Sequence, residues 1–307
     1  MNPWLVTGAG GMLARDVLRQ LAAAGVPAFG LGRSTLDVTE ADSVRFLLKD
    51  HRPAVVVNCA AWTAVDDAEA QPAAALAVNG TGARQVAEAC AATGTVLIQV
   101  STDYVFAGDA GAPYREDAPT APRSVYGRTK LAGEQGVLET LPDTGYVVRT
   151  GWLYGANGPS FVRSMIHLEQ ARDTLDVVDD QRGQPTWTRD LADRLVALGR
   201  GALDGTAPPG VYHGTSTGET TWFEYARQIF TLLGADPERI RPTSTDVFPR
   251  PAPRPAYSVL SHGRWRTAGI EPIRPWREAL AEALPEVRRA AAGGRAGGKE
   301  GRPLRQA

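Results

Sequence analysis

The chain has 307 residues, of which 43% are hydrophobic and 22% charged, and its formal net charge is -1. This length allows one large domain or two modest ones, with a core that needs neither disulfides nor a metal. A chain so close to neutral lacks the overall field that attracts nucleic acid or an anionic membrane surface, so we expect neither as a partner.

The cysteines and the N-terminal residues point to a compartment. Cys59 and Cys90 fall in an apolar strand pattern and a helical pattern, and we predict two reduced core thiols of a cytosolic protein. No cluster of histidine and cysteine suggests a metal site. The opening stretch "NPWLVTGAGG" has neither the basic flank nor the apolar run of a signal peptide or membrane span. We therefore expect a cytoplasmic protein that binds no metal.

Short β-branched runs alternate with helical segments through the first half of the chain. We expect strands at residues 4–8, 27–32, 54–60, 95–101 and 146–150, and the helical patterns between them lie at 12–25, 41–52, 75–94 and around Tyr126. Near-continuous apolar strands that alternate with helices are typical of a parallel sheet covered on both faces. The pattern predicts an α/β fold with a doubly wound, Rossmann-like parallel sheet, whose carboxyl edge binds ligands.

The regular alternation of strand and helix patterns ends after Thr150. A helix at 188–200 and a strand at 210–214 return to the sheet pattern, and Thr221 with Glu224 forms a capping box for a helix at 222–234. A proline-rich stretch and a final amphipathic helix near 275–290 follow.

These patterns predict a division of the chain into two parts and a tail. We expect residues 1–151 and 187–214 to form a dinucleotide-binding domain and 152–186 and 215–288 a smaller α+β substrate lobe. Residues 289–307 have almost nothing to bury and are expected to be a disordered tail.

A glycine turn joins the first strand to the first helix. "TGAGGMLA" reads Gly8-x-x-Gly11-x-x-Ala14, with Gly10 as an additional glycine. The glycines allow a tight turn and the close approach of a pyrophosphate to the helix N-terminus, and the small third residue allows close packing. The alternative is a glycine-rich turn that binds nothing.

The segment "LGRSTLDV" after the second strand bears on which dinucleotide is bound. Arg33 stands where a basic residue tolerates the ribose phosphate of NADP(H), so we favour NADPH and keep NADH as an alternative. A solvated loop arginine is an equally good explanation of Arg33. Asp37 and Val38 could flank the adenine, and Ala60 and Ala61 are small enough for the third loop to touch the cofactor.

The stretch "VYGRTKLAGE" places Tyr126 one helical turn before Lys130, and the chain has only three lysines, at 49, 130 and 299. A tyrosine ionises near pH ~10, so acid-base work at neutrality requires about 4 kcal/mol of stabilisation of the phenolate. One cation about 4 Å away supplies that amount at an effective dielectric constant of ~20. Residues i and i+4 share a helix face, although such pairs often do no more than support a helix.

The fourth strand ends in "STDYVF", which places Ser101, Thr102 and Asp103 at the expected carboxyl edge. A hydroxyl there can hold a carbonyl oxygen and a carboxylate can hold a sugar hydroxyl. The alternative is a polar turn in which these side chains only cap the next segment.

Several of these motifs together resemble a known family. The chain from about Pro3 to Arg289 is similar to the extended short-chain dehydrogenase/reductases, and within them to the dTDP-4-dehydrorhamnose reductases. The glycine turn and the tyrosine-lysine pair mark the superfamily, whereas "STDYVF" and "DQxGxPT" are more specific. The segments that carry the resemblance are "TGAGGMLA", "NCAAWTAVDDAE", "STDYVF", "VYGRTKLAGE", "VVRTGWLYG", "DDQRGQPTW" and "RPAYSVL".

The resemblance implies roles for the residues of the catalytic group. Tyr126 would donate a proton to a sugar ketone while the nicotinamide delivers hydride, and Lys130 would bind the nicotinamide ribose and lower the pKa of the phenol. Thr102 would contact the reacting oxygen, and Asp103 would contact the substrate.

The resemblance also extends the expected binding sites. Trp152 would pack against the sugar, although a large aromatic there could equally fill the core. Arg254 could pair with the nucleotide diphosphate or belong to a rigid surface loop. Trp62 and Arg33 depart from the histidine and the acidic residue of other members. The expected cofactor-binding residues are Gly8, Gly10, Gly11, Met12, Leu13, Arg33, Asp37, Val38, Ala60, Ala61, Trp62, Thr63, Tyr126 and Lys130.

By this resemblance we expect NADPH-dependent reduction of the 4-keto group of dTDP-4-dehydro-6-deoxy-L-mannose to dTDP-L-rhamnose. Reduction of a related dTDP-4-keto sugar of an antibiotic, as by a dTDP-dihydrostreptose synthase, is the alternative. Dehydration is disfavoured because Tyr104, and not glutamate, follows Asp103. A non-catalytic dinucleotide-binding regulatory subunit is the alternative from another class, and a homodimer is a further possibility.

Overall fold

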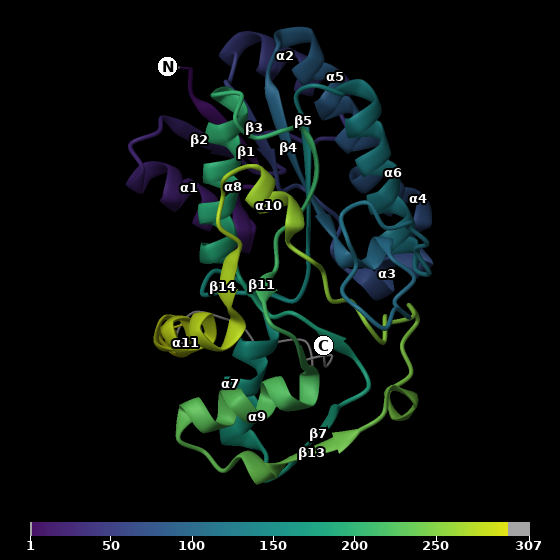
Figure 1. Ribbon diagram of the computed structural model, residues 1–307, viewed down its shortest axis with the longest axis vertical. Coiled ribbons are helices and arrows are strands. Elements are labelled where there is room, and N and C mark those ends of the chain that lie inside the picture. Colours follow the sequence, from purple (N-terminus) through teal and green to yellow (C-terminus); the bar gives the residue numbers. More distant parts are fainter. Residues whose placement is uncertain (1, 294–307) are drawn as a thin grey trace.

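The computed structural model describes residues 2–293, and a six-stranded sheet lies at its centre (Figure 1). All its strand pairs are parallel, in the order β10-β5-β4-β3-β1-β2. The predicted doubly wound parallel sheet is confirmed. Its strands are β1 (Trp4–Thr7), β2 (Ala28–Leu31), β3 (Val55–Asn58), β4 (Val96–Thr102), β5 (Gly145–Thr150) and β10 (Gly210–His213).

The strand order reverses at β1, which pairs with β2 on one side and with β3 on the other. The last residues of two neighbouring strands, Thr7 and Asn58, lie opposite each other. In open parallel sheets the crevice at such a reversal is where ligands bind, because the loops leave in opposite directions. The loops after β1 and β3 therefore form one side of the candidate site.

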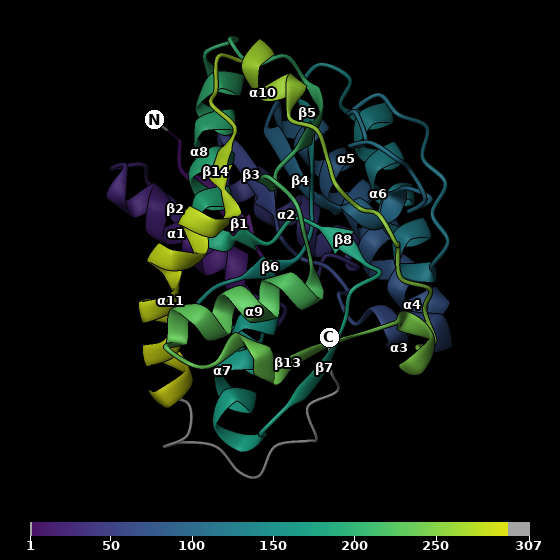
Figure 2. The same ribbon diagram turned by 60° about the horizontal axis from the view of Figure 1, so that its bottom comes forward.

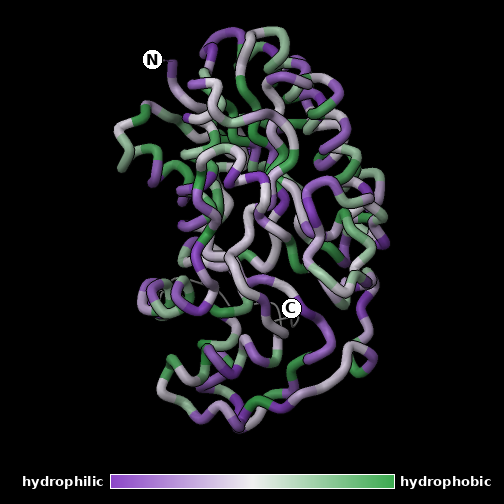
Figure 3. The backbone as a smooth tube through the Cα atoms, in the orientation of Figure 1, coloured by the Kyte–Doolittle hydropathy of each residue, from purple (hydrophilic) through white to green (hydrophobic). Residues whose placement is uncertain are grey.

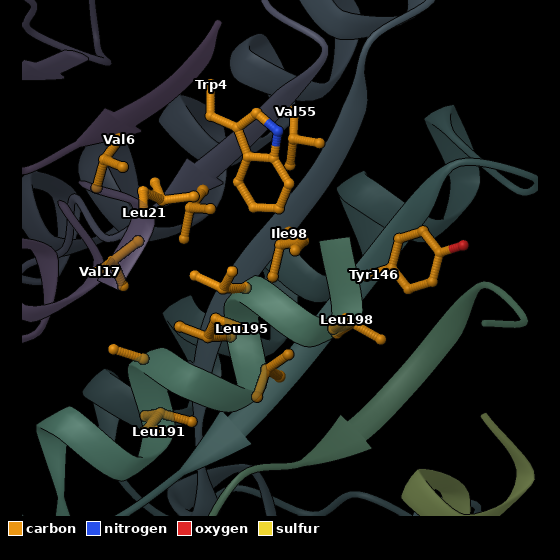
Figure 4. Packing of buried hydrophobic residues seen from close by; sticks show 14 of the residues in the cluster. Trp4, Val6, Val17, Leu21, Val55, Ile98, Tyr146, Leu191, Leu195 and Leu198 are labelled. Atoms are coloured by element: carbon orange, nitrogen blue, oxygen red, sulfur yellow. The ribbon is translucent and has the colours of Figure 1, made fainter. Parts of the chain in front are cut away.

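Helices cover both faces of the sheet. One face carries α1 (Met12–Ala23) and α8 (Thr188–Leu203), and the other carries α2 (Ala41–His51), α5 (Ala83–Thr93) and α6 (Val125–Thr140). The side chains of Trp4, Leu21 and Leu195 fill the space between the sheet and the first pair of helices (Figure 4). The apolar residues concentrate along the strands at the centre of this part (Figure 3).

The segment predicted as one helix at 75–94 is interrupted. It consists of α4 (Pro72–Leu76), a π-helix η1 (Ala77–Gly82) and α5, and α3 (Val65–Ala70) precedes them. Gly133 of α6 packs on the carbonyl of Asn79, and a Cβ at Gly133 would overlap it. The expectation of a regular helix is wrong here, and π-turns of this kind occur often at functional sites.

A smaller lobe lies beyond the carboxyl edge of the sheet (Figure 2). Its own apolar core includes Tyr154, Tyr225, Phe230 and Trp276. Its helices are α7 (Phe161–Ala171), α9 (Trp222–Leu233) and α11 (Trp276–Gly293). Its paired short strands are β6 (Leu153–Tyr154) with β9 (Thr186–Trp187), β7 (Leu175–Val178) with β13 (Ile240–Thr243), β8 (Arg182–Gly183) with β12 (Thr220–Thr221), and β11 (Ser216–Thr217) with β14 (Ile273–Pro275).

Short helical turns complete the described chain: η2 (Asp103–Val105), η3 (Pro237–Arg239), η4 (Thr245–Val247) and α10 (Gly263–Thr267). Thr221 caps α9, as predicted, by accepting a hydrogen bond from the amide of Glu224 at 3.2 Å. Trp265 of α10 differs from the expected division, because it is fully buried in the core cluster of the sheet and not in that of the lobe. Its indole N–H donates to the His213 carbonyl at 2.6 Å, which attaches α10 to β10.

Helix α11 continues to Gly293, past residue 289 where the tail was expected to begin, and the rest of the predicted tail, 294–307, lies outside the described residues. Cys59 and Cys90 are free thiols. Between residues 2 and 293, no helix has the length and apolar character needed to cross a membrane. The same range holds no group of three or more His, Cys, Asp or Glu residues that could bind a metal ion.

Candidate active site

The glycine turn after β1 has the geometry that a pyrophosphate requires. Gly8 has φ of 64°, and a Cβ there would lie 2.9 Å from the amide nitrogen of Ala60 in the loop after β3. The amide of Gly11 donates to the carbonyl of Gly8 at 2.8 Å, and Gly11 is the N-cap of α1. Gly10 faces open space. The turn thus leaves backbone amides and a helix N-terminus free of side-chain cover, which fits a dinucleotide phosphate.

Two residues after the turn have different surroundings. The side chain of Leu13 is buried in the core cluster, so only its backbone belongs to the turn. Met12 lies beside Gly155 and Gly158 of the segment that follows β6. Asn157 of this segment donates a hydrogen bond to the carboxylate of Asp16 on α1, which also accepts one from Thr188 of α8.

A buried polar network supports the loop after β3. Thr7 donates to Asn58, Asn58 donates to Gln99 at 2.7 Å, and Gln99 donates to the Val100 carbonyl at 2.9 Å. The amide of Ala60 faces the oxygen atoms of Thr7 and Asn58 at 3.3 Å each. The sequence-based interpretation missed this network, although Thr7 and Asn58 at the ends of two apolar strands and Gln99 within a third were its visible signal.

The third cofactor loop is held by Asn79 of the π-helix. Asn79 accepts a hydrogen bond from the amide of Trp62 at 2.8 Å and donates to its carbonyl and to the hydroxyl of Thr129, both at 3.1 Å. Trp62 is partly buried, Thr63 is exposed, and Ala61 lies between buried and exposed. Asn79 was also missed, and it connects this loop to the helix that carries Tyr126.

The residues after β2 form a local cluster. Arg33 is highly exposed, and its Nε lies 3.4 Å from a carboxylate oxygen of Asp37. Asp37 also accepts hydrogen bonds from the amide and hydroxyl of Thr39, which lower the pKa of its carboxyl group. Val38 is buried against Gly82. Arg33 and Asp37 thus form an ion pair in the segment after β2, while Val38 packs against η1.

Tyr126 and Thr102 meet at the carboxyl end of β4. Burial raises the pKa of Tyr126 to about 12, and a hydrogen bond with Thr102 opposes this rise. The ring of Tyr126 lies edge-on to that of Tyr104, with centroids 5.7 Å apart. Ser124 caps α6 by accepting a hydrogen bond from the amide of Gly127 at 3.0 Å, which fixes the first turn of the helix and with it Tyr126.

Lys130 lies on the same helix, one turn after Tyr126. Its Nζ donates to the carbonyl of Val100 at 2.6 Å. Burial lowers the pKa of Lys130 to about 8, and Lys130 is not among the groups that lower the pKa of Tyr126. The Lys130 ammonium group is thus bonded to the backbone of β4, and the lowering of the phenol pKa by Lys130 stays a prediction.

The candidate substrate residues near the sheet, Thr102 and Asp103, are buried. Asp103 is buried beneath Gly151, where a Cβ would lie 2.7 Å from its carboxylate oxygen. Burial raises its pKa to about 6, against hydrogen bonds from Ser258 and Thr102 that lower it. Its hydroxyl neighbour is close as well, with Thr102 Oγ1 3.0 Å from Asp103 Oδ1.

The two other candidate substrate residues already have protein partners. Trp152 has φ of 50° and stacks on Trp222 of α9, with ring centroids 3.5 Å apart. The guanidinium of Arg254 donates to the carboxylate of Asp66 at 3.0 Å. Trp152 therefore has the packing role that the sequence left open, and Arg254 links the proline-rich segment to α3.

The family model described as "RmlD substrate binding domain" matches residues 1–289 of this chain. The dTDP-4-dehydrorhamnose reductase of Streptomyces griseus is 62% identical over 284 residues, which cover 92% of this chain and 93% of the relative. A probable dTDP-4,6-dihydroxy-2-methyloxan-3-one 4-ketoreductase of Streptomyces antibioticus is 54% identical, with 92% and 95% of the two chains covered.

Among solved structures, the dTDP-4-dehydrorhamnose reductase of Bacillus anthracis in complex with NADP superposes with a TM-score of 0.88 at 36% identity. The match covers 93% of this chain and 99% of that one. The similarity extends over both the sheet and the smaller lobe. The chain therefore belongs to the RmlD substrate-binding-domain family, that of the dTDP-4-dehydrorhamnose reductases.

Proposed function

We propose that this protein is an NADPH-dependent reductase of the 4-keto group of dTDP-4-dehydro-6-deoxy-L-mannose, with dTDP-L-rhamnose as its product. The observation that carries the proposal is the meeting of Tyr126 and Thr102 at the end of β4, on the same sheet edge as the open glycine turn after β1. The names of the relatives at 62% and 36% identity support it.

The cofactor fits the residues that are present. The turn of Gly8, Gly10 and Gly11 would hold the pyrophosphate, and Arg33 at the end of β2 would hold the phosphate that distinguishes NADPH from NADH. When bound, NADPH supplies the hydride. Lys130 would hold the ribose with the donors of its ammonium group that Val100 does not use.

The chain's own residues would handle the proton and the substrate. With a pKa of about 12, the Tyr126 phenol is protonated at neutral pH and is a proton source for the oxygen of a carbonyl that accepts hydride. Thr102 would hold that oxygen through its hydroxyl group. Asp103, with a pKa of about 6, would be mostly ionised at pH 7 and could accept a hydrogen bond from a sugar hydroxyl.

The test combines the protein, NADPH and an enzymatically made dTDP-4-keto-6-deoxy-L-sugar, and follows the absorbance of reduced nicotinamide. We expect consumption of NADPH by wild type and a fall of about 10²- to 10⁴-fold in kcat for Tyr126→Phe. Binding of NADPH, measured by fluorescence, should be unchanged in that variant. Equal rates for wild type and Tyr126→Phe would reject the proposed role and favour a non-catalytic binding subunit.

A second candidate is reduction of a different dTDP-4-keto sugar, of the kind used in antibiotics. The relative from Streptomyces antibioticus favours it, because its name specifies a different sugar ketone at 54% identity. NMR identification of the product decides between the two, since dTDP-L-rhamnose and the alternatives differ in ring substitution and stereochemistry. Sizing by light scattering distinguishes a monomer from the homodimer that the sequence left open.

A further inference from the structure

A buried ion pair joins α6, one turn after Lys130, to β5, and the proposed chemistry does not use this pair. Glu134 of α6 and Arg149 of β5 are 2% and 4% exposed. Arg149 donates from Nε to Oε1 of Glu134 at 3.0 Å and from Nη2 to Oε2 at 2.7 Å. The pair therefore holds one carboxylate in a fixed place inside the protein.

Stability of the fold gives a weak reason for such a pair. Removing two ions from water is costly, and apolar residues of similar volume are often as stable or more so. Arg149 is held from other sides as well, because its guanidinium lies over the ring of Phe106, 4.9 Å from the centroid, and its Nη1 approaches the Glu116 carbonyl at 3.4 Å. Because these contacts hold the Arg149 guanidinium in place, they also hold the Glu134 carboxylate that is bonded to it.

The position of Glu134 relative to the candidate catalytic residues is the second observation. Tyr126, Lys130 and Glu134 follow one another at intervals of four on α6, so they lie on one side of the helix. Lys130 is only 3% exposed, and charges in such surroundings act on each other with little screening. Burial lowers the pKa of Lys130, and Glu134 has the largest opposing effect.

Other ionisable groups come to this region from neighbouring elements. Cys59, after β3, faces Lys130, but burial raises the pKa of its thiol to about 12, so it is uncharged at neutral pH. η2 contributes Asp103 and Tyr104, and burial raises the pKa of each. Arg149 on β5 is positive and opposes the ammonium group. Glu134 is therefore the carboxylate that favours a charged Lys130.

We propose that Glu134, held in place by Arg149, is a positioning residue that keeps the Lys130 ammonium protonated at neutral pH. Its catalytic consequence rests on the function proposed above, in which Lys130 acts as a cation. The protonation state of Lys130 can be measured without substrate or cofactor, so the two proposals can fail separately.

The small number of lysines makes a direct measurement practical. Full-length protein labelled with [¹³Cε]lysine gives signals from only three lysines, and Lys49→Arg and Lys299→Arg variants assign that of Lys130. The pH titration of this signal is compared between wild type and Glu134→Gln. We expect the midpoint of Lys130 to fall by about one pH unit or more in the variant, as for removal of a nearby opposite charge. An unchanged midpoint would overturn the proposal.

Glu134→Gln leaves Arg149 without a counterion and can unfold the chain, so a second variant replaces both residues. The double substitution Glu134→Met with Arg149→Met keeps the volume and removes both charges, and we expect the Lys130 midpoint to fall here too, by less than in Glu134→Gln because the opposing charge of Arg149 is also lost. Glu139→Gln is the matched control, because Glu139 lies on the same helix and pairs with Arg84 at the surface.

The pH profile of kcat/KM separates this inference from the proposed function. The alkaline limb should move to lower pH in both Glu134 variants and stay in place in Glu139→Gln. A lower midpoint of Lys130 with an unchanged pH profile would uphold the inference about Glu134 and count against the catalytic role proposed for Lys130.

Discussion

The indole rings of Trp152 and Trp222 lie face to face, with centroids 3.5 Å apart and 8° between their planes. Trp152 lies two residues after the end of the sheet strand β5, and Trp222 is the first residue of α9 in the smaller lobe. Gly183 lies against this stack, where a Cβ would come 2.5 Å from Cε2 of Trp152. The glycine of the "DQRGQPT" stretch is therefore required by the position of an indole ring.

We predict that Gly183→Ala displaces Trp152 and lowers the free energy of unfolding by about 1–3 kcal/mol, the usual cost of overpacking. Urea unfolding measures the loss, and the near-ultraviolet circular dichroism of the stacked indoles should change with it. Gly111→Ala is the control, because a Cβ there meets nothing within 4 Å. Equal stability of both variants would show that the stack tolerates a methyl group at Gly183.

Gly8→Ala should weaken NADPH binding. The positive φ of Gly8 costs an alanine about 1–3 kcal/mol, and its methyl group would also press on the backbone of Cys59 and Ala60. Gly25→Ala shares the positive φ but has open space around it, so it controls for strain alone. Fluorescence titration with NADPH should show weaker binding in Gly8→Ala and wild-type affinity in Gly25→Ala.

Arg33→Ser should reduce the preference for NADPH over NADH. A hydrogen-bonded contact to a charged group contributes about 1.5–3 kcal/mol, so we expect the dissociation constant of NADPH to rise about tenfold or more. The dissociation constant of NADH should stay the same, as measured by calorimetry. Arg45→Ser, at an exposed ion pair on α2, is the control. An equal rise in the dissociation constants of NADPH and NADH would show that Arg33 supports the loop and does not bind the phosphate.

Asp103 should set the acid limb of the pH profile. Burial raises its pKa to about 6, so the carboxylate that is proposed to hold the substrate is lost as the pH falls through that value. The value of kcat/KM should therefore fall below pH 6 in wild type. Asp103→Asn should have lower activity and no such limb, and Asp109→Asn at the surface should keep the wild-type profile. An acid limb that survives in Asp103→Asn belongs to another group.

Two buried histidines should make the fold sensitive to acid. Burial lowers the pKa of His213 to about 3 and that of His262 to about 4, with Arg149 adding to the shift of His213. The unfolded chain binds protons at these histidines from about pH 6.5 downwards, and the folded chain does not. The free energy of unfolding therefore decreases as the pH is lowered, by up to about 1.4 kcal/mol per pH unit for each histidine.

Urea unfolding midpoints at pH 7, 6 and 5 measure this slope. His213→Asn should flatten it, whereas His51→Asn, at an exposed position, should not. A slope that is the same in all three proteins would contradict a neutral buried His213.

The sequence predicted the sheet, its order along the chain and the glycine turn, because those features depend on residues close together in the chain. A run of apolar residues such as "AVVVN" predicts a strand, and glycines predict a turn. The place of Tyr126 and Lys130 on one helix was visible for the same reason. What Lys130 binds was not, because Val100 lies thirty residues earlier and only the packing of α6 on β4 brings them together.

Two features were readable in principle. "YVVRT" places Arg149 in an otherwise apolar strand, and a buried arginine requires a partner. Glu134 follows Lys130 by one helical turn, so an interaction between Glu134 and Lys130 could have been predicted. The stack of Trp152 on Trp222 had no such signal, because seventy residues and a change of lobe separate the two rings.

The burial of Trp265 in the sheet's core has a consequence for synthesis. A ribosome releases the chain from its N-terminus, so β10 emerges after α7 and the first short strands of the smaller lobe, and α10 emerges only after most of that lobe. The parallel sheet therefore lacks its last strand and a fully buried indole until late in translation, and its apolar face stays open during that time. For a chain of this kind the nascent form, more than the finished one, is the state that chaperones must protect.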